Sequence, residues 1–259
     1  MLIKEKRQVF SNTAKQCLVT LIAAVVVFTF SARDTNAATL LTGWDFQTTM
    51  NGGTQARAAP NSPLVYSANF GSGTIYLNGT NGSSSFTSPS SNPEVTGFGG
   101  TAVNAGSGFS TSTSGASALA IANSSANSKS IAVTFSTVGY AGISFSYATQ
   151  RTTTGFNTQA LSYSVDGGGN FVSVVTPAFT PPASYGSRSV DLSAITALND
   201  VTNVILLITL NGATNSSGNN RFDNIQLNAA EAAPEPTTAA LFCLSGSFLL
   251  GLRRRKSLR

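Results

Sequence analysis

Alternation of apolar and polar residues is the feature of this sequence that most constrains its fold. Residues 143–147 (ISFSY) and 161–165 (LSYSV) place an apolar side chain at every second position, which is the pattern of a strand with one buried face. Residues 131–135 (IAVTF) repeat this alternation, and residues 204–208 (VILLI) are continuously apolar, as expected of a strand covered on both faces. Because helical periodicity is nearly absent, the chain is predicted to be all-β.

Short links rich in Gly, Asp and Asn separate the alternating runs. Residues 166–170 (DGGGN) lie between 161–165 and 171–175 (FVSVV), which predicts a β-hairpin, because these residues tolerate positive φ. Asn-Gly pairs mark further turns at 51, 78, 81 and 211. Strands at this density, with so little helix, predict a single two-sheet β-sandwich. A repeat solenoid is the minority alternative.

Two segments of the middle region are harder to interpret. Residues 79–115 are rich in Ser, Thr, Gly and Asn, so they could be flexible or could form weakly patterned strands. The apolar side chains of Val95, Phe98, Val103 and Phe109 favour strands. Residues 191–195 (DLSAI) predict one capped turn, because Asp is a preferred helix N-cap.

Three short motifs carry a resemblance to a known fold. They are residues 43–46 (GWDF), 151–156 (RTTTGF) and 221–225 (RFDNI). Together with LSYSVDGG they resemble jelly-roll domains of exported bacterial proteins, a pattern that galactose-binding-like and carbohydrate-binding modules share. The resemblance implies a jelly-roll-like sandwich, and in many jelly rolls the first and last strands are neighbours. The apolar positions Phe222, Ile225 and Leu227 predict the last strand, with an irregularity at Asp223-Asn224. It supports a fold more than a ligand, because one sandwich hosts many functions.

The N-terminus has the pattern of a secretory signal. Basic residues within residues 4–15 precede an apolar run at 17–30, which is short for a bilayer span of roughly 20 residues. Thr35 and Ala37 suit the −3 and −1 positions of a cleavage site before Ala38. We therefore expect residues 1–37 to be a signal peptide with a short helix, removed by signal peptidase. An uncleaved membrane anchor is the alternative.

The C-terminus has three parts in a fixed order. Pro234, Glu235 and Pro236 precede an apolar stretch, which is followed by the basic cluster Arg253, Arg254, Arg255 and Lys256. At a rise of 1.5 Å per residue the apolar stretch spans roughly 24 Å, short of a hydrocarbon core of about 30 Å. A basic tail of this kind stays on the cytoplasmic side of a membrane.

This tail closely resembles the PEP-CTERM sorting signal. The resemblance implies transit across the inner membrane of a Gram-negative-type bacterium, followed by recognition at Pro234, Glu235 and Pro236 by an exosortase. It also implies a producer of extracellular polysaccharide. We therefore expect a signal peptide at 1–37, a sandwich at 38–228, a linker with the motif at 229–236, and a transmembrane helix with its basic tail at 237–259. A plain single-pass anchor is the alternative.

Composition excludes several classes of function for the middle of the chain. The full chain has 15 Lys and Arg, 10 Asp and Glu, and no His. Residues 38–236 hold five of the basic residues and eight of the acidic ones, a net charge of −3, so the positive charge belongs to the ends. No nucleic-acid partner is therefore expected. Both cysteines, Cys17 and Cys243, lie in the terminal apolar segments, which excludes a disulfide, a thiolate zinc site or a His-based triad in the middle.

A few residues are candidates for ligand or metal binding. Trp44 and Arg151 are candidates for contact with a polysaccharide, the first by stacking and the second through sugar hydroxyls or acidic groups. The alternatives are a core position for Trp44 and an ion pair or an exposed position for Arg151. Asp45 and Asp223 would approach each other if the first and last strands are neighbours, and two carboxylates with backbone carbonyls suit Ca²⁺. In the alternative, Asp223 caps a bend and Asp45 is exposed.

The sequence indicates no catalytic machinery. Without His, a Ser nucleophile would need another base, and no acid stands in a glycosidase motif. We expect a non-catalytic surface or matrix protein that is exported, sorted by an exosortase, and structural or adhesive in a polysaccharide matrix. A carbohydrate-binding module is the second hypothesis, and a lyase or glycosidase on the same scaffold is the third. No cofactor other than calcium is expected.

Overall fold

A computed structural model describes residues 38–47, 64–88, 92–174, 176–177 and 179–232. All of the described residues belong to a single compact unit. The predicted signal peptide, the Pro234–Pro236 motif and the C-terminal helix with its basic tail lie outside the described residues. None of the helical turns in the described part of the chain has the length and apolar character needed to cross a lipid bilayer.

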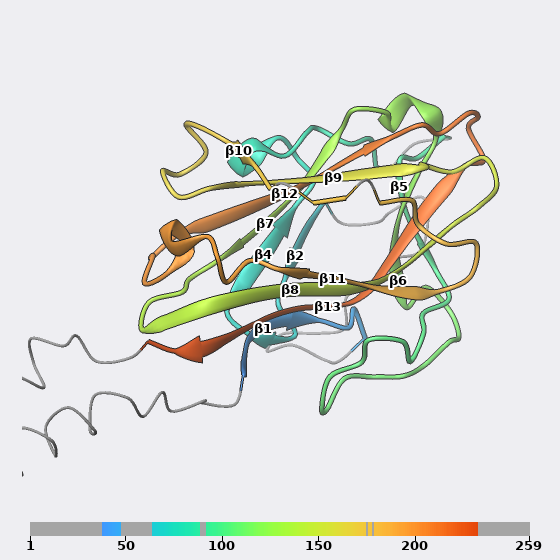
Figure 1. Cartoon of the computed structure of the whole chain (residues 1–259). Coiled ribbons are helices and arrows are strands. Elements are labelled where there is room, and N and C mark those ends of the chain that lie inside the picture. The colour runs from blue at the N-terminus through green and yellow to red at the C-terminus, as the bar shows by residue number, and fades with distance from the viewer. Residues whose placement is uncertain (1–37, 48–63, 89–91, 175, 178, 233–259) are drawn as a thin grey trace, which may run out of the picture. The chain divides into compact units, whose positions relative to one another are not determined.

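Two antiparallel sheets form a β-sandwich (Figure 1). The seven-stranded sheet runs in the order β11 (Gly186–Asp191), β8 (Tyr140–Arg151), β13 (Asn219–Glu231), β1 (Thr39–Trp44) and β3 (Phe70–Gly71). In the same sheet, β13 also pairs with β6 (Ala118–Ala122), which pairs with β5 (Val95–Phe98). The six-stranded sheet runs in the order β10 (Val172–Ser173), β9 (Thr158–Ser164), β12 (Val204–Asn211), β7 (Ser130–Phe135), β4 (Gly73–Tyr76) and β2 (Val65–Ser67). The predicted all-β sandwich is confirmed.

The described helical structure consists of three single 3₁₀ turns, η1 (Thr80–Gly82), η2 (Ser124–Ala126) and η3 (Thr196–Leu198). The expected capped turn is present just before η3, because Asp191 Oδ1 accepts a hydrogen bond from the Ser193 amide at 2.9 Å. The expected hairpin is also present, since β9 and β10 pair across residues 166–170 with Tyr163 opposite Val172.

The continuously apolar run at 204–208 is covered on both faces, as its sequence predicts. Leu206 and Ile208 pack into the main core between the sheets. Ile205 and Leu207 point the other way and pack with Ala132 in a second cluster on the outer face of the six-stranded sheet. Leu207 is 7% exposed and Ile205 is fully buried, so the run at 204–208 has no solvated face.

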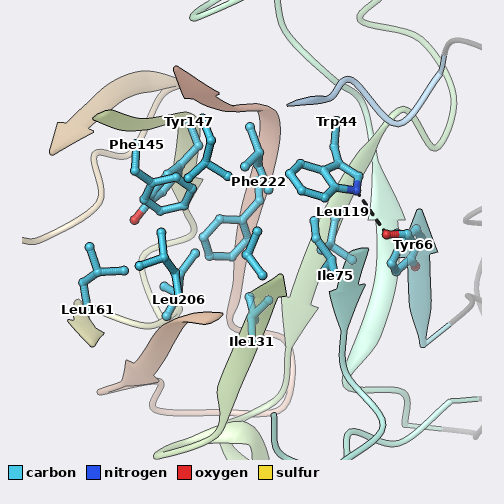
Figure 2. Packing of buried hydrophobic residues seen from close by; sticks show 14 of the residues in the cluster. Trp44, Tyr66, Ile75, Leu119, Ile131, Phe145, Tyr147, Leu161, Leu206 and Phe222 are labelled. Atoms are coloured by element: carbon cyan, nitrogen blue, oxygen red, sulfur yellow. Dashed lines mark hydrogen bonds between the residues drawn. The ribbon is translucent and has the colours of Figure 1, made fainter. Parts of the chain in front are cut away.

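Aromatic side chains fill the main core (Figure 2). Phe145 and Tyr147 from β8 lie beside Phe222 from β13. The ring centroids are 5.2 Å apart for Phe145 and Tyr147 and 5.6 Å apart for Tyr147 and Phe222. Trp44 and Tyr66 occupy the other side of this core, and both are fully buried. The side chains come from both sheets, so this cluster holds the two layers together through the burial of apolar surface.

The first and last strands of the sandwich are neighbours, as the motif resemblance implies. Strand β1 pairs with β13, and Trp44 lies opposite Ile225. The irregularity expected at Asp223-Asn224 is a register shift between Asp223 and Gln226 where β13 pairs with β8, with Asn224 at a φ of 48°. Strand β13 continues to Glu231, three residues beyond the predicted end of the sandwich at 228.

The segment at 79–115 holds fewer strands than expected. Val95 and Phe98 bound strand β5 as the sequence suggests, but Val103 and Phe109 lie in a long connection between β5 and β6. The expectation is therefore wrong for these two residues. Phe109 covers Gly43 of β1 and stacks on Phe70 of β3 with the ring centroids 4.4 Å apart. Its apolar side chain thus covers the sheet without pairing with it.

Candidate functional site

A cavity of about 420 Å³ lies at one edge of the six-stranded sheet. Its polar lining consists of hydroxyl groups and one amide, from Ser67, Ser72, Thr74, Thr134, Ser136, Thr202 and Asn203. The remaining lining residues are Ala, Gly and Phe135, so no charged side chain lines this cavity among the described residues. We call it the hydroxyl groove. Its volume lies within the range of roughly 300–1,000 Å³ that is typical of ligand pockets.

Strand pairing explains why hydroxyl groups gather in the groove. Ser67 on β2 lies opposite Thr74 on β4, which lies opposite Thr134 on β7. Since Ile75 and Val133 point into the core, their neighbours Thr74 and Thr134 point outward. Thr134 Oγ1 donates to the Thr74 carbonyl oxygen at 3.1 Å. Three hydroxyl-bearing side chains therefore form one row across three adjacent strands.

A partly exposed aromatic surface lies beside this row. The next outward row contains Tyr76, Ala132 and Leu207 on β4, β7 and β12. Tyr76 and Phe171 are the half-buried aromatics that pack on this outer cluster. Tyr76 follows Thr74 by two positions on one strand, so the two side chains share a face at a spacing of about 7 Å. The hydroxyl groove and the Tyr76 ring therefore belong to one continuous surface.

Trp44 does not belong to any exposed surface. Its side chain is fully buried, and its indole Nε1 donates to the Tyr66 carbonyl oxygen at 3.1 Å (Figure 2). A sugar ring cannot stack on a side chain that has no accessible face, so the prediction of Trp44 as a ligand-binding residue is wrong. The Trp44 side chain points inward from β1 and belongs to the main core.

Arg151 holds a turn at the end of β8. Its Nε donates to the Pro181 carbonyl oxygen at 3.0 Å, and its Nη1 lies 3.3 Å from the Thr153 carbonyl oxygen and 3.5 Å from that of Thr152. These acceptors are backbone groups, and no carboxylate partner is present among the described residues. A ligand contact by Arg151 stays a prediction.

Asp45 and Asp223 both lie against the connection between β5 and β6. Asp45 Oδ2 accepts from the Ser110 amide at 2.8 Å, and Asp223 Oδ2 accepts from the Thr101 amide at 2.8 Å. Their other oxygens accept from the Gln47 and Asn224 amides, respectively. Asp223 therefore contacts its own backbone as the alternative interpretation expects, but Asp45 is fully buried instead of exposed.

These bonds do not fit a calcium site. All four carboxylate oxygens face N–H donors, whereas Ca²⁺ takes six to eight oxygen ligands. Among the described residues, no group of three or more acidic, His or Cys side chains could hold a metal ion. The geometry supports a structural role in which the two aspartates anchor the long connection to the sheet. The calcium binding expected from the sequence is therefore left to a calcium titration.

Glu94 and Lys129 form an ion pair, in which Lys129 Nζ lies 2.6 Å from Glu94 Oε2. Burial alone would raise the pKa of Glu94, but hydrogen bonds from Lys129, Ser125 and the Thr87 amide, together with the charge of Lys129, hold it below its usual value. The Glu94 side chain is 2% exposed. The pair ties the start of β5 to the segment before β7, which is a structural task.

No protein-family model and no curated protein matches the chain. Several solved structures are similar to it. The xylan-binding CBM22-1 domain of Xyn10C from Paenibacillus barcinonensis is 11% identical, with 76% of this chain and 99% of that chain covered and a TM-score of 0.39. The family 11 carbohydrate-binding module of cellulase Lic26A-Cel5E from Clostridium thermocellum is 13% identical, with 78% and 99% covered and a TM-score of 0.35.

An adhesin domain has a comparable similarity. The K2 adhesin domain of Lys-gingipain is 12% identical, with 74% of this chain and 97% of that chain covered and a TM-score of 0.37. At such identities the likeness concerns the β-sandwich fold alone. It assigns no ligand to this chain.

The hydroxyl groove was not expected from the sequence. Thr74 and Thr134 stand at outward positions of alternating runs, which is a signal that sequence analysis can detect. That signal does not reveal that the two strands are neighbours, because 60 residues separate Thr74 from Thr134. The small residues Gly71, Ser72 and Gly73, where β3 ends and β4 begins, give a second, weaker signal of a tight turn beside an open surface.

Proposed function

We propose that this chain is an exported surface or matrix protein whose β-sandwich binds a neutral polysaccharide in the hydroxyl groove. The observation that carries the proposal is an uncharged cavity lined by hydroxyl and amide groups beside the half-buried ring of Tyr76. Hydroxyl groups both donate and accept hydrogen bonds, as sugar hydroxyls do. An aromatic ring offers a flat apolar surface to the C–H face of a sugar. The groove therefore matches both sides of a neutral pyranose.

The proposal includes export and sorting by the two terminal signals. It is supported by the basic and apolar pattern of residues 1–37 and by the order of Pro234–Pro236, the apolar stretch and Arg253–Arg255. In this proposal signal peptidase and an exosortase act on the chain at the inner membrane of a Gram-negative-type bacterium. The sandwich is then delivered to the cell surface or the extracellular polysaccharide.

A non-catalytic role accompanies the proposal. The described acidic side chains whose contacts are given above stabilise turns or anchor loops. Asp166, for example, accepts hydrogen bonds from the Ser164 and Asn170 side chains in the turn between β9 and β10. A structural or adhesive role in a polysaccharide matrix needs binding without turnover, and the groove offers hydrogen-bonding groups for that. A sandwich that binds no glycan would leave only the structural role.

A glycan array with the purified chain tests the proposal. We expect binding to one class of neutral oligosaccharide. The Tyr76→Ala and Thr134→Val variants should each weaken this binding at least about tenfold, the factor that corresponds to 1.4 kcal/mol. Tyr76→Phe keeps the stacking face and should retain binding.

Thr209→Val is the matched control for Thr134→Val. Thr209 also points outward from the six-stranded sheet and bonds to Ser130 at 2.7 Å, but it does not line the groove. Equal binding by wild type, Tyr76→Ala and Thr134→Val would contradict the assignment of the groove.

A further inference from the structure

Arg188 is a buried arginine at the edge of the seven-stranded sheet. It lies on β11, which is the terminal strand of the sheet and, among the described strands, pairs with β8 alone (Figure 1). Arg188 stands opposite Tyr147, so its side chain points between the two sheets. It is 5% exposed, although a guanidinium is among the groups least often buried. Such a placement calls for a partner that neutralises its charge.

Within the described part of the chain, the groups that contact Arg188 are all neutral. Nη1 donates to Tyr147 Oη at 3.0 Å and to the Gln159 carbonyl oxygen at 3.1 Å. Tyr147 Oη in turn donates to Gln159 Oε1 at 2.7 Å. Burial raises the pKa of Tyr147 to about 12, so the phenol is uncharged at neutral pH. The guanidinium also lies over the Phe179 ring, 4.5 Å from its centroid.

No carboxylate of the described residues pairs with Arg188 within 4 Å. A guanidinium stays protonated in proteins, so the residue cannot escape its charge by losing a proton. A buried charge without a counter-ion is unfavourable by several kcal/mol unless other groups compensate it. The two hydrogen bonds and the aromatic ring compensate in part, and they leave the net charge in place.

Arg188 also lines a cavity. Within the described residues, Nε and Nη2 have no protein acceptor and are not sealed from solvent. The cavity has a volume of about 410 Å³, and Thr176, Phe179, Ser187, Arg188, Ser189 and Asp191 line it together with Pro177 and Val190. We call it the arginine cavity. Its lining includes one strong cationic donor, the Thr176 hydroxyl group and an aromatic ring.

We propose that the arginine cavity binds the carboxylate of an acidic sugar residue, a hexuronate. The Nε–Nη2 side of a guanidinium presents two parallel N–H donors in one plane, which match the two oxygens of a carboxylate. The hydroxyl group of Thr176, which lines the cavity, is available to a sugar hydroxyl. The bound carboxylate supplies the counter-charge that Arg188 lacks.

Asp191 limits what the cavity accepts. Hydrogen bonds from the Ser193 side chain and amide lower the pKa of Asp191, so it carries a negative charge at neutral pH. A second anionic group near Asp191 would be repelled. The cavity is therefore suited to a single carboxylate.

This site is independent of the hydroxyl groove. The groove lies beside β2, β4 and β7, whereas the arginine cavity lies along β11, at the end of the other sheet. The two cavities share no lining residue and differ in charge. The hexuronate site therefore does not rest on the proposed binding of a neutral polysaccharide.

Calorimetry with matched acidic and neutral probes tests the hexuronate site. The purified chain is titrated with tri-galacturonate and with its methyl ester, which removes the charge and keeps the sugar. We expect tri-galacturonate to bind at least about tenfold more tightly, the factor for 1.4 kcal/mol. Equal binding of acid and ester, or tighter binding of a sulfated galactose trisaccharide, would overturn the assignment.

Two variants distinguish the site from general attraction of anions. Arg188→Gln should abolish the difference between acid and ester. Because this variant removes buried hydrogen bonds and its fold can fail, Asp191→Asn provides a second test at an exposed position. Asp191→Asn should strengthen tri-galacturonate binding several-fold and leave ester binding unchanged.

Asp200→Asn is the matched control, since it removes the same charge from an exposed side chain that does not line the cavity. An equal gain in Asp200→Asn and Asp191→Asn would sink the proposal. Thr134→Val should leave tri-galacturonate binding unchanged, so that failure of the groove and failure of the arginine cavity give different results.

Discussion

Trp44 donates its indole hydrogen to the carbonyl oxygen of Tyr66 at 3.1 Å, and both side chains are fully buried. The bond joins β1 of one sheet to β2 of the other. Phe46 packs edge-on against the Tyr66 ring with the centroids 5.7 Å apart. The aromatic residue that the sequence suggests for sugar stacking thus connects the two layers.

Trp44→Phe is therefore expected to destabilise the fold and to spare glycan binding. The substitution removes one buried hydrogen bond and part of the indole volume, which together should lower the free energy of unfolding by about 2 kcal/mol. Thermal unfolding and a glycan array measure the two effects separately. Val138→Ala, at a side chain that is 51% exposed, is the surface control and should change stability little. Loss of glycan binding by a folded Trp44→Phe variant would contradict this assignment.

Asn224 is expected to anchor the connection between β5 and β6. Its Nδ2 donates to the Thr101 and Val103 carbonyl oxygens at 2.7 and 2.9 Å, and its φ is 48°. Asn224→Ala loses both bonds and also places an alanine in the left-handed region, which costs roughly 1–2 kcal/mol. We expect faster hydrogen exchange at the Thr101 amide and a lower unfolding free energy.

Asn224→Gly separates the two causes. Glycine adopts positive φ without strain, so this variant loses the bonds alone. It should be more stable than Asn224→Ala by about 1 kcal/mol, while its hydrogen exchange at residues 99–104 should be equally fast. If alanine and glycine gave the same unfolding free energy, the backbone conformation at 224 would carry no cost.

The strands could be predicted where the local pattern determines the outcome. The alternation at 143–147 and 161–165 and the apolar run at 204–208 give strands because burial of one or both faces depends on local spacing. The bulge at Asp223-Asn224 was expected because two short polar residues interrupt the apolar positions. These features need no knowledge of the partner strand.

The two proposed binding surfaces could not be predicted, because they depend on strand pairing and not on local spacing. Thr74 and Thr134 form a groove only because β4 and β7 pair, and Arg188 is buried only because β9 lies over β11 through Gln159. Trp44 illustrates the same limit, since alternation does not say which face of β1 is covered. Phe109 shows that an apolar residue can cover a sheet from a loop. Each case depends on contacts between residues far apart in the chain.

Glu94 is expected to give the fold a pH-dependent stability. Its pKa is lower in the folded protein than the ordinary value of 4.5, so ionised Glu94 stabilises the fold above that value. The contribution is lost as pH falls through the folded-state pKa. Urea unfolding between about pH 3 and pH 7 should therefore show a decline at the acid end that is weaker in Glu94→Gln. If the unfolding free energies of the wild type and Glu94→Gln fell equally at acid pH, the role of Glu94 would be contradicted.

Lys129→Met should destabilise the fold more than Glu94→Gln at neutral pH. Removing Lys129 leaves the Glu94 carboxylate, which is 2% exposed, buried without its cation, and an unpaired buried charge is costlier than a neutral amide. The expected difference in unfolding free energy is at least about 1 kcal/mol. Equal losses in the two variants at neutral pH would show that Glu94 is hydrated or otherwise compensated without Lys129.

Calcium provides the test of how Asp45 and Asp223 act. A metal ion at a free concentration of one hundred times its Kd stabilises a fold by about 2.7 kcal/mol. If these residues formed a calcium site, addition of Ca²⁺ would raise the melting temperature and a chelator would lower it. Because the carboxylate oxygens of both residues face backbone amides, we expect neither change. Asp45→Asn should lower the melting temperature equally in calcium and in chelator, since it weakens the bond to the Ser110 amide. A loss confined to calcium-containing buffer would instead assign these two carboxylates to a metal site, and the connection at 99–117 would then be held by the ion.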